Sequence, residues 1–537
     1  MKLVKILKKI NIYHLIIGAT IVISFFFRFK NIENMVWEQI GNDESRDMLV
    51  AEHLVNYGET IKRGPFAAGG FNWIMNSPFY YYVVAIIWLF TRDPVVFMKV
   101  WAFFFSLFPL IGYLIGKELK DRKLGLIVAL FFAINGELIY QSRQLLQPFF
   151  LPVWSSLFLL MILKTKKKPH YFYLSAAAFF LFIGLHFHYG VFLIMPVGIF
   201  LLAKFWFKLI DLDPSPKNIF VPLASALLIF LLWIFSTYKY YPFDQILFFI
   251  INFTEKEPVF LVDKIKNTIN SIVWTTYPSK SFIFSEIVIF GLTLLGLLIK
   301  KDQDLKNKTK IVLILAGSAF FMFLSNGYIA RTYLLSTLPF FLITMSIGIY
   351  QLFKINKFTK IIGLLLLTTI FIDQYQNSYY LVGTHPNISF YEQKKAIAEV
   401  IYQDYYLDKK HLTPKFVLAA LEVNHTLPYD EWGTTGFLYQ LEKLTQTKLV
   451  RTVNYGLNIA QLTKDADVFY FICDHRMDNS VNIINSSCLN PFIKARKYLG
   501  KEYTKIFESA NFTVWKFQII KNKQQFNYNY TYEELLN

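Results

Sequence analysis

Three carboxylates and one arginine stand close together at Asp43, Glu44, Arg46 and Asp47. They follow an apolar run at 13–29, so they lie where the chain first leaves a membrane. Charge beside lipid is costly unless a function uses it. A carboxylate in that place can act as a general base, which takes the proton of a hydroxyl or amine as that group attacks. The structural alternative is that the acidic pair only caps a helix and matches its dipole.

A helix from about 44 to 57 is expected to carry these residues. Its apolar residues recur at the spacing that gathers them on one helical face, and Gly58 follows as a stop. Asp43 would then occupy the N-cap position and Glu44 the first turn. The expected apolar face consists of Met48, Leu49, Ala51, Leu54 and Val55.

The composition indicates a polytopic α-helical membrane protein. Hydrophobic residues make up 55% of the chain and charged residues 17%, and apolar runs alternate with lysine clusters. Because the lysines stand between apolar runs, the net charge of +18 is a topology signal, and we expect no nucleic-acid partner. The predicted spans, about eleven, are 13–29, 98–115, 124–140, 149–163, 171–186, 190–207, 219–237, 282–299, 311–325, 332–353 and 358–373.

A further apolar run, 79–91, is short, follows Pro78 and opens with aromatic residues, which is typical of an interfacial helix. If it spanned the membrane, the lysine-rich loops after it would face outward, against the positive-inside rule. We therefore predict a multi-pass plasma-membrane protein with a cytoplasmic N-terminus and a retained first anchor. Residues 30–97 then form a large first outer loop, 141–148 form a second, and everything beyond 373 lies outside.

The transmembrane domain is expected over 1–373, followed by an extracytoplasmic α/β domain over 374–537, which is long enough for its own core. The only two cysteines, Cys473 and Cys488, fall in this second domain, and their sequence positions leave open whether they pair. The predicted strands are Lys415–Val423, Asp467–Cys473 and Asn511–Ile520, and the predicted helices are Tyr391–Tyr406 and Thr435–Thr445.

Six short motifs occur in an order that matches this topology. They are Asp43-Glu44-Ser-Arg46-Asp47, Arg63-Gly-Pro65, Ser77-Pro-Phe-Tyr-Tyr-Tyr82, Ser142-Arg143 with Gln147-Pro148, Leu185-His-Phe-His188, and Ala330-Arg-Thr-Tyr333. The set resembles the GT-C membrane glycosyltransferases, and within them the family that includes the protein O-mannosyltransferases and the aminoarabinose transferase of lipid A. The resemblance covers roughly residues 1–373.

The resemblance implies transfer of a sugar from a polyprenyl-phosphate donor to an unidentified acceptor at the outer face of the bilayer. By position, Asp43 matches the family's first-loop aspartate, which serves as general base or binds near a metal, and Glu44 matches its acidic neighbour. Guanidinium groups suit the charge that develops on a leaving lipid phosphate. The residues expected to bind substrate are Arg46, Asp47, Tyr81, Arg143, His188, Arg331 and Tyr333.

Each of these residues also has a structural interpretation. Arg143 and Arg331 fall at outer ends of spans, where arginines also contact lipid headgroups. His188 also fits a packed histidine, and Tyr81 also fits an aromatic belt at the membrane surface.

No cofactor is certain from the sequence, and a divalent metal ion stays an open alternative. Some relatives carry an acidic residue where this chain has Asn76 or Phe149, and both departures weaken the implication of a metal. Asp43 and Glu137 are the candidate ligands, because Glu137 is the nearest carboxylate in the outer part of the third predicted span.

Two other classes of function compete with the transferase. A transporter or lipid flippase would place acidic and arginine residues in mid-span and would often show an inverted repeat, and neither feature is evident here. A non-catalytic scaffold would use its outer domain to bind a partner in the cell envelope. For that outer domain, recognition of the acceptor, capping of the cavity and stabilisation of the membrane part are the interpretations we carry forward.

Overall fold

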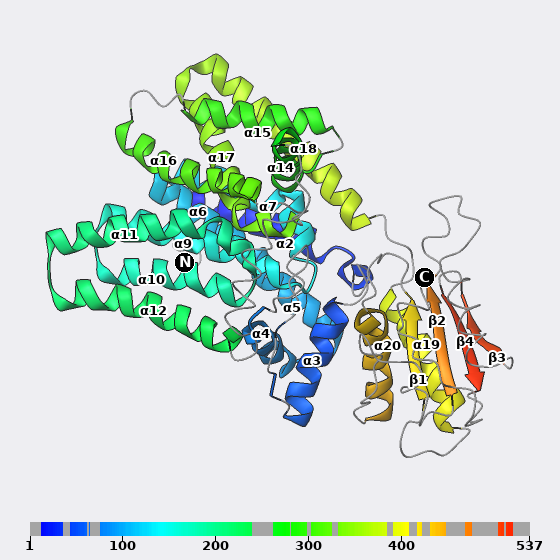
Figure 1. Cartoon of the computed structure of the whole chain (residues 1–537). Coiled ribbons are helices and arrows are strands. Elements are labelled where there is room, and N and C mark those ends of the chain that lie inside the picture. The colour runs from blue at the N-terminus through cyan, green and yellow to red at the C-terminus, as the bar shows by residue number, and fades with distance from the viewer. Residues whose placement is uncertain are drawn as a thin grey trace, which may run out of the picture. The chain divides into compact units, whose positions relative to one another are not determined.

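The computed structural model describes fifteen stretches of the chain: 12–35, 43–58, 60–61, 64, 76–238, 261–279, 281–297, 302–324, 331–383, 390–407, 416–421, 430–446, 468–474, 503–509 and 512–518. The chain divides into two compact units (Figure 1). The helical unit comprises Met1–Ile32, Thr60–Ile87 and Val96–Thr384, and the α/β unit comprises Glu33–Glu59, Trp88–Val95 and His385–Asn537.

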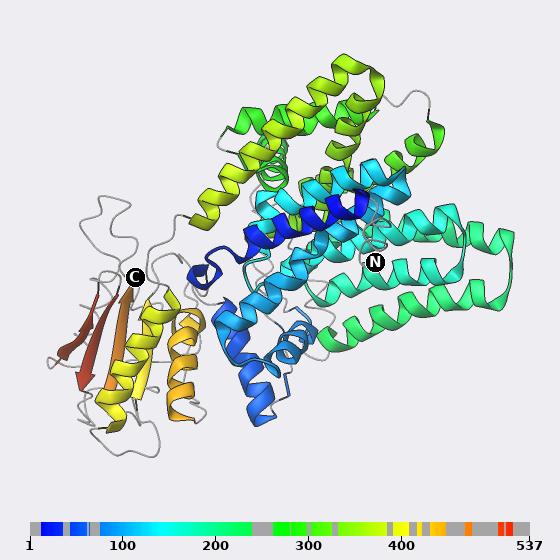
Figure 2. The same cartoon turned by 180° about the vertical axis from the view of Figure 1, so that it is seen from behind.

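The helical unit consists of α-helices, and some of the described connections between them are 3₁₀-helical (Figure 2). The α-helices are α2 (Ile12–Phe29), α4 (Phe79–Trp88), α5 (Pro94–Ser106), α6 (Phe108–Leu119), α7 (Arg122–Ile134), α8 (Gly136–Gln141), α9 (Phe150–Lys167), α10 (Tyr171–Ile183), α11 (Met195–Leu212), α12 (Pro216–Tyr238), α14 (Leu261–Thr276), α15 (Phe282–Leu297), α16 (Gln303–Gly317), α17 (Leu338–Ile355) and α18 (Lys357–Gly383). The 3₁₀ turns are η2 (Gln147–Phe149), η3 (Gly184–His186), η4 (Tyr189–Leu193), η5 (Ser318–Leu324) and η6 (Arg331–Ser336).

Six helices among the described residues are long and apolar enough to cross a membrane, which confirms the polytopic class. Three shorter apolar helices accompany them, at Phe79–Trp88, Tyr171–His186 and Ile283–Leu297. The run 79–91, which was predicted to be an interfacial helix, forms the short helix Phe79–Trp88, as its length indicated. The six long segments are Ile12–Phe29, Pro94–Leu119, Gln147–Lys167, Pro216–Ser236, Leu338–Ile355 and Lys357–Gln376.

The predicted span 124–140 is instead two helices, because Asn135 takes an extended conformation between α7 and α8. The Asn135 side chain accepts a hydrogen bond from the backbone N–H of Leu138 at 3.0 Å, and it donates to the carbonyl of Thr276 at 2.8 Å. The side chain of Gln374 accepts from the N–H of Gly136 at 3.0 Å. Two amide side chains therefore satisfy the backbone groups that the break exposes.

Helix α17 is the central element of the helical unit, because its side chains are buried from Leu338 through Tyr350. Close backbone approaches join it and other helices to their neighbours. A Cβ atom on Gly348 of α17 would lie 2.2 Å from the carbonyl oxygen of Leu292 in α15. A Cβ atom on Gly116 of α6 would lie 2.6 Å from the Cα of Gly125 in α7. Glycine at these positions permits the close approach of the two helices.

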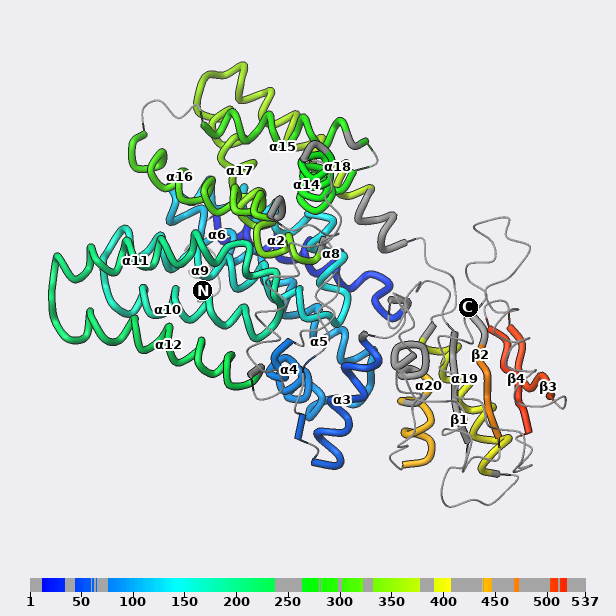
Figure 3. Tube along the Cα trace, viewed as in Figure 1, coloured from blue at the N-terminus to red at the C-terminus, as the bar shows by residue number. Residues whose placement is uncertain are grey.

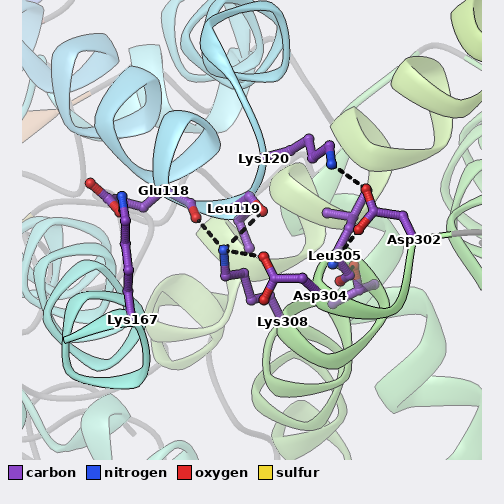
Figure 4. Close-up of polar contacts among 9 residues, drawn as sticks. Glu118, Leu119, Lys120, Lys167, Asp302, Asp304, Leu305 and Lys308 are labelled. Atoms are coloured by element: carbon purple, nitrogen blue, oxygen red, sulfur yellow. Dashed lines mark hydrogen bonds and ion pairs between the residues drawn. The ribbon is translucent and has the colours of Figure 1, made fainter. Parts of the chain in front are cut away.

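Charged side chains tie the end of α6 to the start of α16 and to α9 (Figure 4). The ammonium of Lys308 donates to the carbonyls of Glu118 at 2.9 Å and Leu119 at 3.4 Å, and it pairs with Asp304 at 2.7 Å. Lys120 pairs with Asp302, and Lys167 pairs with Glu118 at 3.2 Å. The buried Lys308 thus neutralises the carbonyl end of α6.

The α/β unit contains a four-stranded sheet in the order β1-β2-β4-β3 (Figure 3). Strands β1 and β2 are parallel, and the other two pairs are antiparallel. Helices α19 and α20 cover one face of the sheet, and α3 packs on α20. The elements are α3 (Asp43–Tyr57), α19 (Phe390–Tyr402) with a π-helical extension (Gln403–Leu407), β1 (Phe416–Leu421), α20 (Asp430–Thr445), β2 (Val468–Asp474), β3 (Tyr503–Glu508) and β4 (Phe512–Gln518).

The three predicted strands correspond to β1, β2 and β4, and both predicted helices of this region are present. Strand β3 was not predicted, because its sequence mixes charged and aromatic residues, as edge strands often do. Cys473 lies in β2, whereas Cys488 lies outside the described residues, so the question of their pairing does too.

We expect Lys308→Met to lower the free energy of unfolding by about 1–3 kcal/mol, because the buried carbonyls of α6 lose a charged donor. Thermal unfolding of the detergent-solubilised protein measures the change. Lys306→Met, on an exposed position of the same helix, is the matched control and should unfold like the wild type. Equal unfolding midpoints for the two variants would remove the capping role from Lys308.

Candidate functional site

The acidic stretch lies on α3 in the α/β unit, and the predicted helix over 44–57 is confirmed. Asp43 is its first residue, and its side chain is outside the described part of the structure. Glu44 is 4% exposed and Asp47 is fully buried. Arg46 donates from both Nε and Nη2 to Oδ1 of Asp47, at 2.9 and 2.7 Å. The charge of Asp47 is therefore balanced on the helix itself, and Glu44 is a nearly buried carboxylate in the first turn.

Of the predicted apolar face of α3, Met48, Leu49 and Ala51 are buried, whereas Leu54 and Val55 are half-buried. The helix ends at Tyr57, and the following Gly58 has a φ of +65°, a left-handed conformation that favours glycine. The element that carries the acidic residues thus begins and ends where the sequence indicated.

Two residues predicted separately, His188 and Tyr333, meet in the helical unit, with their ring centroids 4.6 Å apart. Both side chains are buried. The Nδ1 atom of His188 accepts from the backbone N–H of Gly190 at 3.0 Å, and Ser336 donates to the carbonyl of Gly190 at 2.7 Å. A neutral imidazole that accepts at Nδ1 carries its proton at Nε2, so His188 presents an N–H donor there. Arg331 begins the same 3₁₀ turn as Tyr333, and its side chain is not among those described.

A serine–histidine chain lies at the start of α4 in the same unit. Ser77 lies 3.1 Å from Nδ1 of His186, whose Nε2 lies 3.2 Å from the carbonyl oxygen of Ile229. Because that carbonyl can only accept, Nε2 carries the proton and Nδ1 accepts from the Ser77 hydroxyl. Ser236 in turn donates to Ser77 at 3.2 Å. Sequence reasoning quoted Ser77 only within a motif and missed Ser236, because no local pattern links them to His186.

Tyr81, also expected to contact substrate, lies buried in the first turn of α4, with its ring centroid 5.6 Å from that of Tyr80. It packs inside the helical unit and does not lie exposed on the outer face of α4, as an aromatic-belt residue would.

Arg143 is fully buried, and its guanidinium donates to the backbone at the end of α2. The bonds run to the carbonyls of Phe27 at 2.9 Å, Lys30 at 2.6 Å and Asn31 at 3.2 Å. Arg28 of α2 is buried beside it and donates to Ser24 and to the carbonyl of Ala133 at 3.2 Å. These bonds satisfy carbonyls at a helix end. They give Arg143 a structural task that neither the lipid-phosphate nor the headgroup interpretation included.

The candidate metal ligands are distributed over both units. Glu137 lies nearly buried on α8 of the helical unit and accepts from Gln141 one turn further along. Asp43 belongs to the α/β unit. Within the described residues, no group of three or more His, Cys, Asp or Glu side chains is arranged to hold a metal ion. The described side chains therefore do not form a ligand set.

These features define a class: a polytopic α-helical membrane protein, in which short helices and 3₁₀ turns join the spans and an α/β unit contains the C-terminal region. The particular similarities come from solved structures. No known family profile matches the sequence, and no curated protein matches it.

ArnT from Cupriavidus metallidurans, solved with undecaprenyl phosphate, superposes with a TM-score of 0.56 at 12% identity. The match covers 94% of this chain and 97% of ArnT. The apo form of the same protein gives a TM-score of 0.59 at 11% identity. The archaeal oligosaccharyltransferase AglB from Archaeoglobus fulgidus, solved with an inhibitory peptide and a dolichol-phosphate, gives 0.50 at 14% identity, over 87% of this chain and 70% of AglB. Both neighbours are GT-C glycosyltransferases. The chain therefore has the GT-C fold, as its sequence motifs suggested.

Because His188 is buried, it is expected to make the folding stability of the protein depend on pH. Burial lowers the pKa of His188 from 6.5 to about 3. Between these values the unfolded chain binds a proton that the folded protein does not, so stability falls as the pH falls from 6.5 toward 3. We expect His188→Gln to remove this contribution, which amounts to at most about 1.4 kcal/mol per pH unit.

Thermal unfolding at about pH 7.5 and about pH 5 measures this contribution. The variant should lose less stability on acidification than the wild type. His14→Gln, which replaces an exposed histidine of α2, should behave as the wild type does. Identical acid sensitivity in all three proteins would show that His188 is not held neutral by burial.

Proposed function

We propose that this protein transfers a sugar from a polyprenyl-phosphate donor to a hydroxyl or amine acceptor at the outer surface of the membrane. The observation that carries the proposal is the helix α3. It places Glu44 and Asp47, nearly or fully buried, soon after the first span of a chain with the GT-C fold. The proposal includes a cytoplasmic N-terminus, because lysine-rich loops then face inward. It also places the α/β unit outside the cell.

The reaction proposed is a single displacement with inversion at the anomeric carbon. The acceptor oxygen or nitrogen forms a bond to that carbon, and the bond from the carbon to the lipid phosphate oxygen breaks. The acceptor proton passes to a carboxylate of α3, with Asp43 as general base and Glu44 beside it. The bonding electrons leave with the polyprenyl phosphate. Arg46 pairs with Asp47 on the same helix, so the charge of Asp47 is already balanced and Asp43 is the carboxylate proposed to take the proton.

On the donor side, His188, Tyr333 and Arg331 are the proposed phosphate contacts. His188 offers its Nε2–H because Gly190 occupies Nδ1, and Arg331 begins the turn that carries Tyr333. A preorganised donor aimed at developing negative charge stabilises the transition state more than the ground state. In this proposal Arg143 does not bind the phosphate itself. It supports the site indirectly, because it holds the end of α2 and the chain that follows it.

Asp43→Asn should reduce the rate of transfer by at least about 100-fold, the effect expected for removing a general base. The measurement is transfer of radiolabelled sugar from a pool of polyprenyl-phosphate sugars in reconstituted vesicles, at equal amounts of folded protein. Glu33→Gln, an acid-to-amide change at an exposed residue of the same outer loop, is the matched control and should leave the rate unchanged.

Unchanged transfer in Asp43→Asn would move the base to Glu44 or Asp47, and the same assay on Glu44→Gln and Asp47→Asn would identify it. Absence of transfer by the wild type with every donor would contradict the transferase proposal. It would favour the two competing classes, a lipid flippase or an envelope scaffold.

A further inference from the structure

Helix α3 is held at its C-terminal half by α20, far along the chain. Nε2 of His53 lies 2.7 Å from Oε2 of Glu442. The Glu442 side chain is 3% exposed and that of His53 is 16% exposed, so the pair is largely withdrawn from water. Both helices belong to the α/β unit, in which they pack against each other. Leaving a largely buried carboxylate without its partner costs free energy. The folded unit therefore favours this particular pairing of Glu442 with His53.

A second contact holds the neighbouring side chain of α3. The indole N–H of Trp88 donates to the carboxylate of Glu52. The fully buried Trp88 ring stands edge-on to the ring of Tyr439 in α20, with centroids 6.0 Å apart. The hydroxyl of Tyr439 donates to the carbonyl of Arg92 at 3.2 Å. Burial raises the pKa of Tyr439, so this hydroxyl keeps its proton and stays a donor.

The two contacts differ in direction around the axis of α3. Glu52 and His53 are adjacent, so their side chains leave the helix about 100° apart. Tyr439 and Glu442 are three residues apart and share one face of α20. Contacts on two sides of a helix oppose its rotation about its own axis, which one contact alone would permit.

Rotation matters because the acidic residues lie on the same helix. Glu52 is nine positions beyond Asp43, a rise of about 13 Å along one continuous helix. A rotation at Glu52 and His53 is therefore carried to Asp43 and Glu44. A displacement of a catalytic group by about 1 Å can cost about 100-fold in rate.

We propose that α20 sets the rotation of α3, and that Glu442 and His53 are positioning residues for the carboxylates at the start of that helix. The inference rests on the proposed function of Asp43 and Glu44. It gives the outer domain a task in the transfer step, in addition to any recognition of the acceptor.

The test compares Glu442→Gln, His53→Gln and the double variant in the vesicle assay. Each single change should lower kcat by about 10- to 100-fold with the donor KM within about twofold, because the base is misplaced while the donor site is untouched. The double variant should be no worse than either single variant, because both changes remove the same contact.

Hydrogen–deuterium exchange provides a readout that does not depend on catalysis. Amides of α3 should exchange faster in Glu442→Gln than in the wild type, because the helix is held less firmly. Asp404→Asn is the first control, since Asp404 binds Lys516 and Tyr470 inside the same unit without touching α3. Glu508→Gln, in an exposed pair with Lys505, is the second control. Both controls should retain kcat within about twofold, since neither residue contacts α3.

Four outcomes would overturn the inference. Unchanged exchange in α3 would show that α20 does not hold the helix. Faster exchange with an unchanged kcat would show that the contact does not position the base, and would leave the proposed function intact. An equal loss of kcat in Asp404→Asn would reduce the effect to general stability of the unit. A wild type without transfer would overturn the proposed function itself, and the positioning role with it. This holds whatever the exchange data show about the contact between α3 and α20.

Discussion

The structure of the helical unit depends on satisfying backbone groups where helices break inside its buried core. A buried N–H or carbonyl has no water to bond there, and each unsatisfied group costs several kcal/mol. The breaks are therefore closed by polar side chains from elsewhere in the chain. Asn135 and Gln374 close the gap between α7 and α8, Arg143 closes the end of α2, and Ser336 closes the turn at Gly190.

This constraint separates polar residues that support the backbone from polar residues that have capacity left for a ligand. Arg143 has three strong bonds to carbonyls within 3.2 Å, so moving it toward a phosphate would expose the end of α2. His188 is different, because its contact with Gly190 uses only the accepting nitrogen and at the same time fixes the tautomer. A single backbone N–H thus determines which nitrogen of the imidazole carries the proton.

Local pattern was sufficient for most of the fold. The acidic helix, its end at Gly58, the membrane class and the strands β1, β2 and β4 follow from periodicity and from stop signals within a few residues. The break at Asn135 was missed because an isolated asparagine in an apolar run looks like a tolerated polar residue until its partners at Thr276 and Leu138 are known. The meeting of His188 with Tyr333, and of His53 with Glu442, was equally beyond sequence reasoning, because a single sequence carries no information on contacts between distant segments.

The assignment of α3 to the α/β unit has a mechanical consequence. The chain leaves the helical unit after Ile32, and Glu33–Glu59 then belongs to the unit that contains the sheet. The acidic residues are thus carried by a helix of the α/β unit, while His188 and Tyr333 lie at 3₁₀ turns of the helical unit. The α/β core offers α3 a firm support, because buried side chains such as Trp88 and Tyr439 can pack against it from several sides. A residue proposed as general base gains from such support, because a displacement of a catalytic group by about 1 Å can lower a rate by about 100-fold.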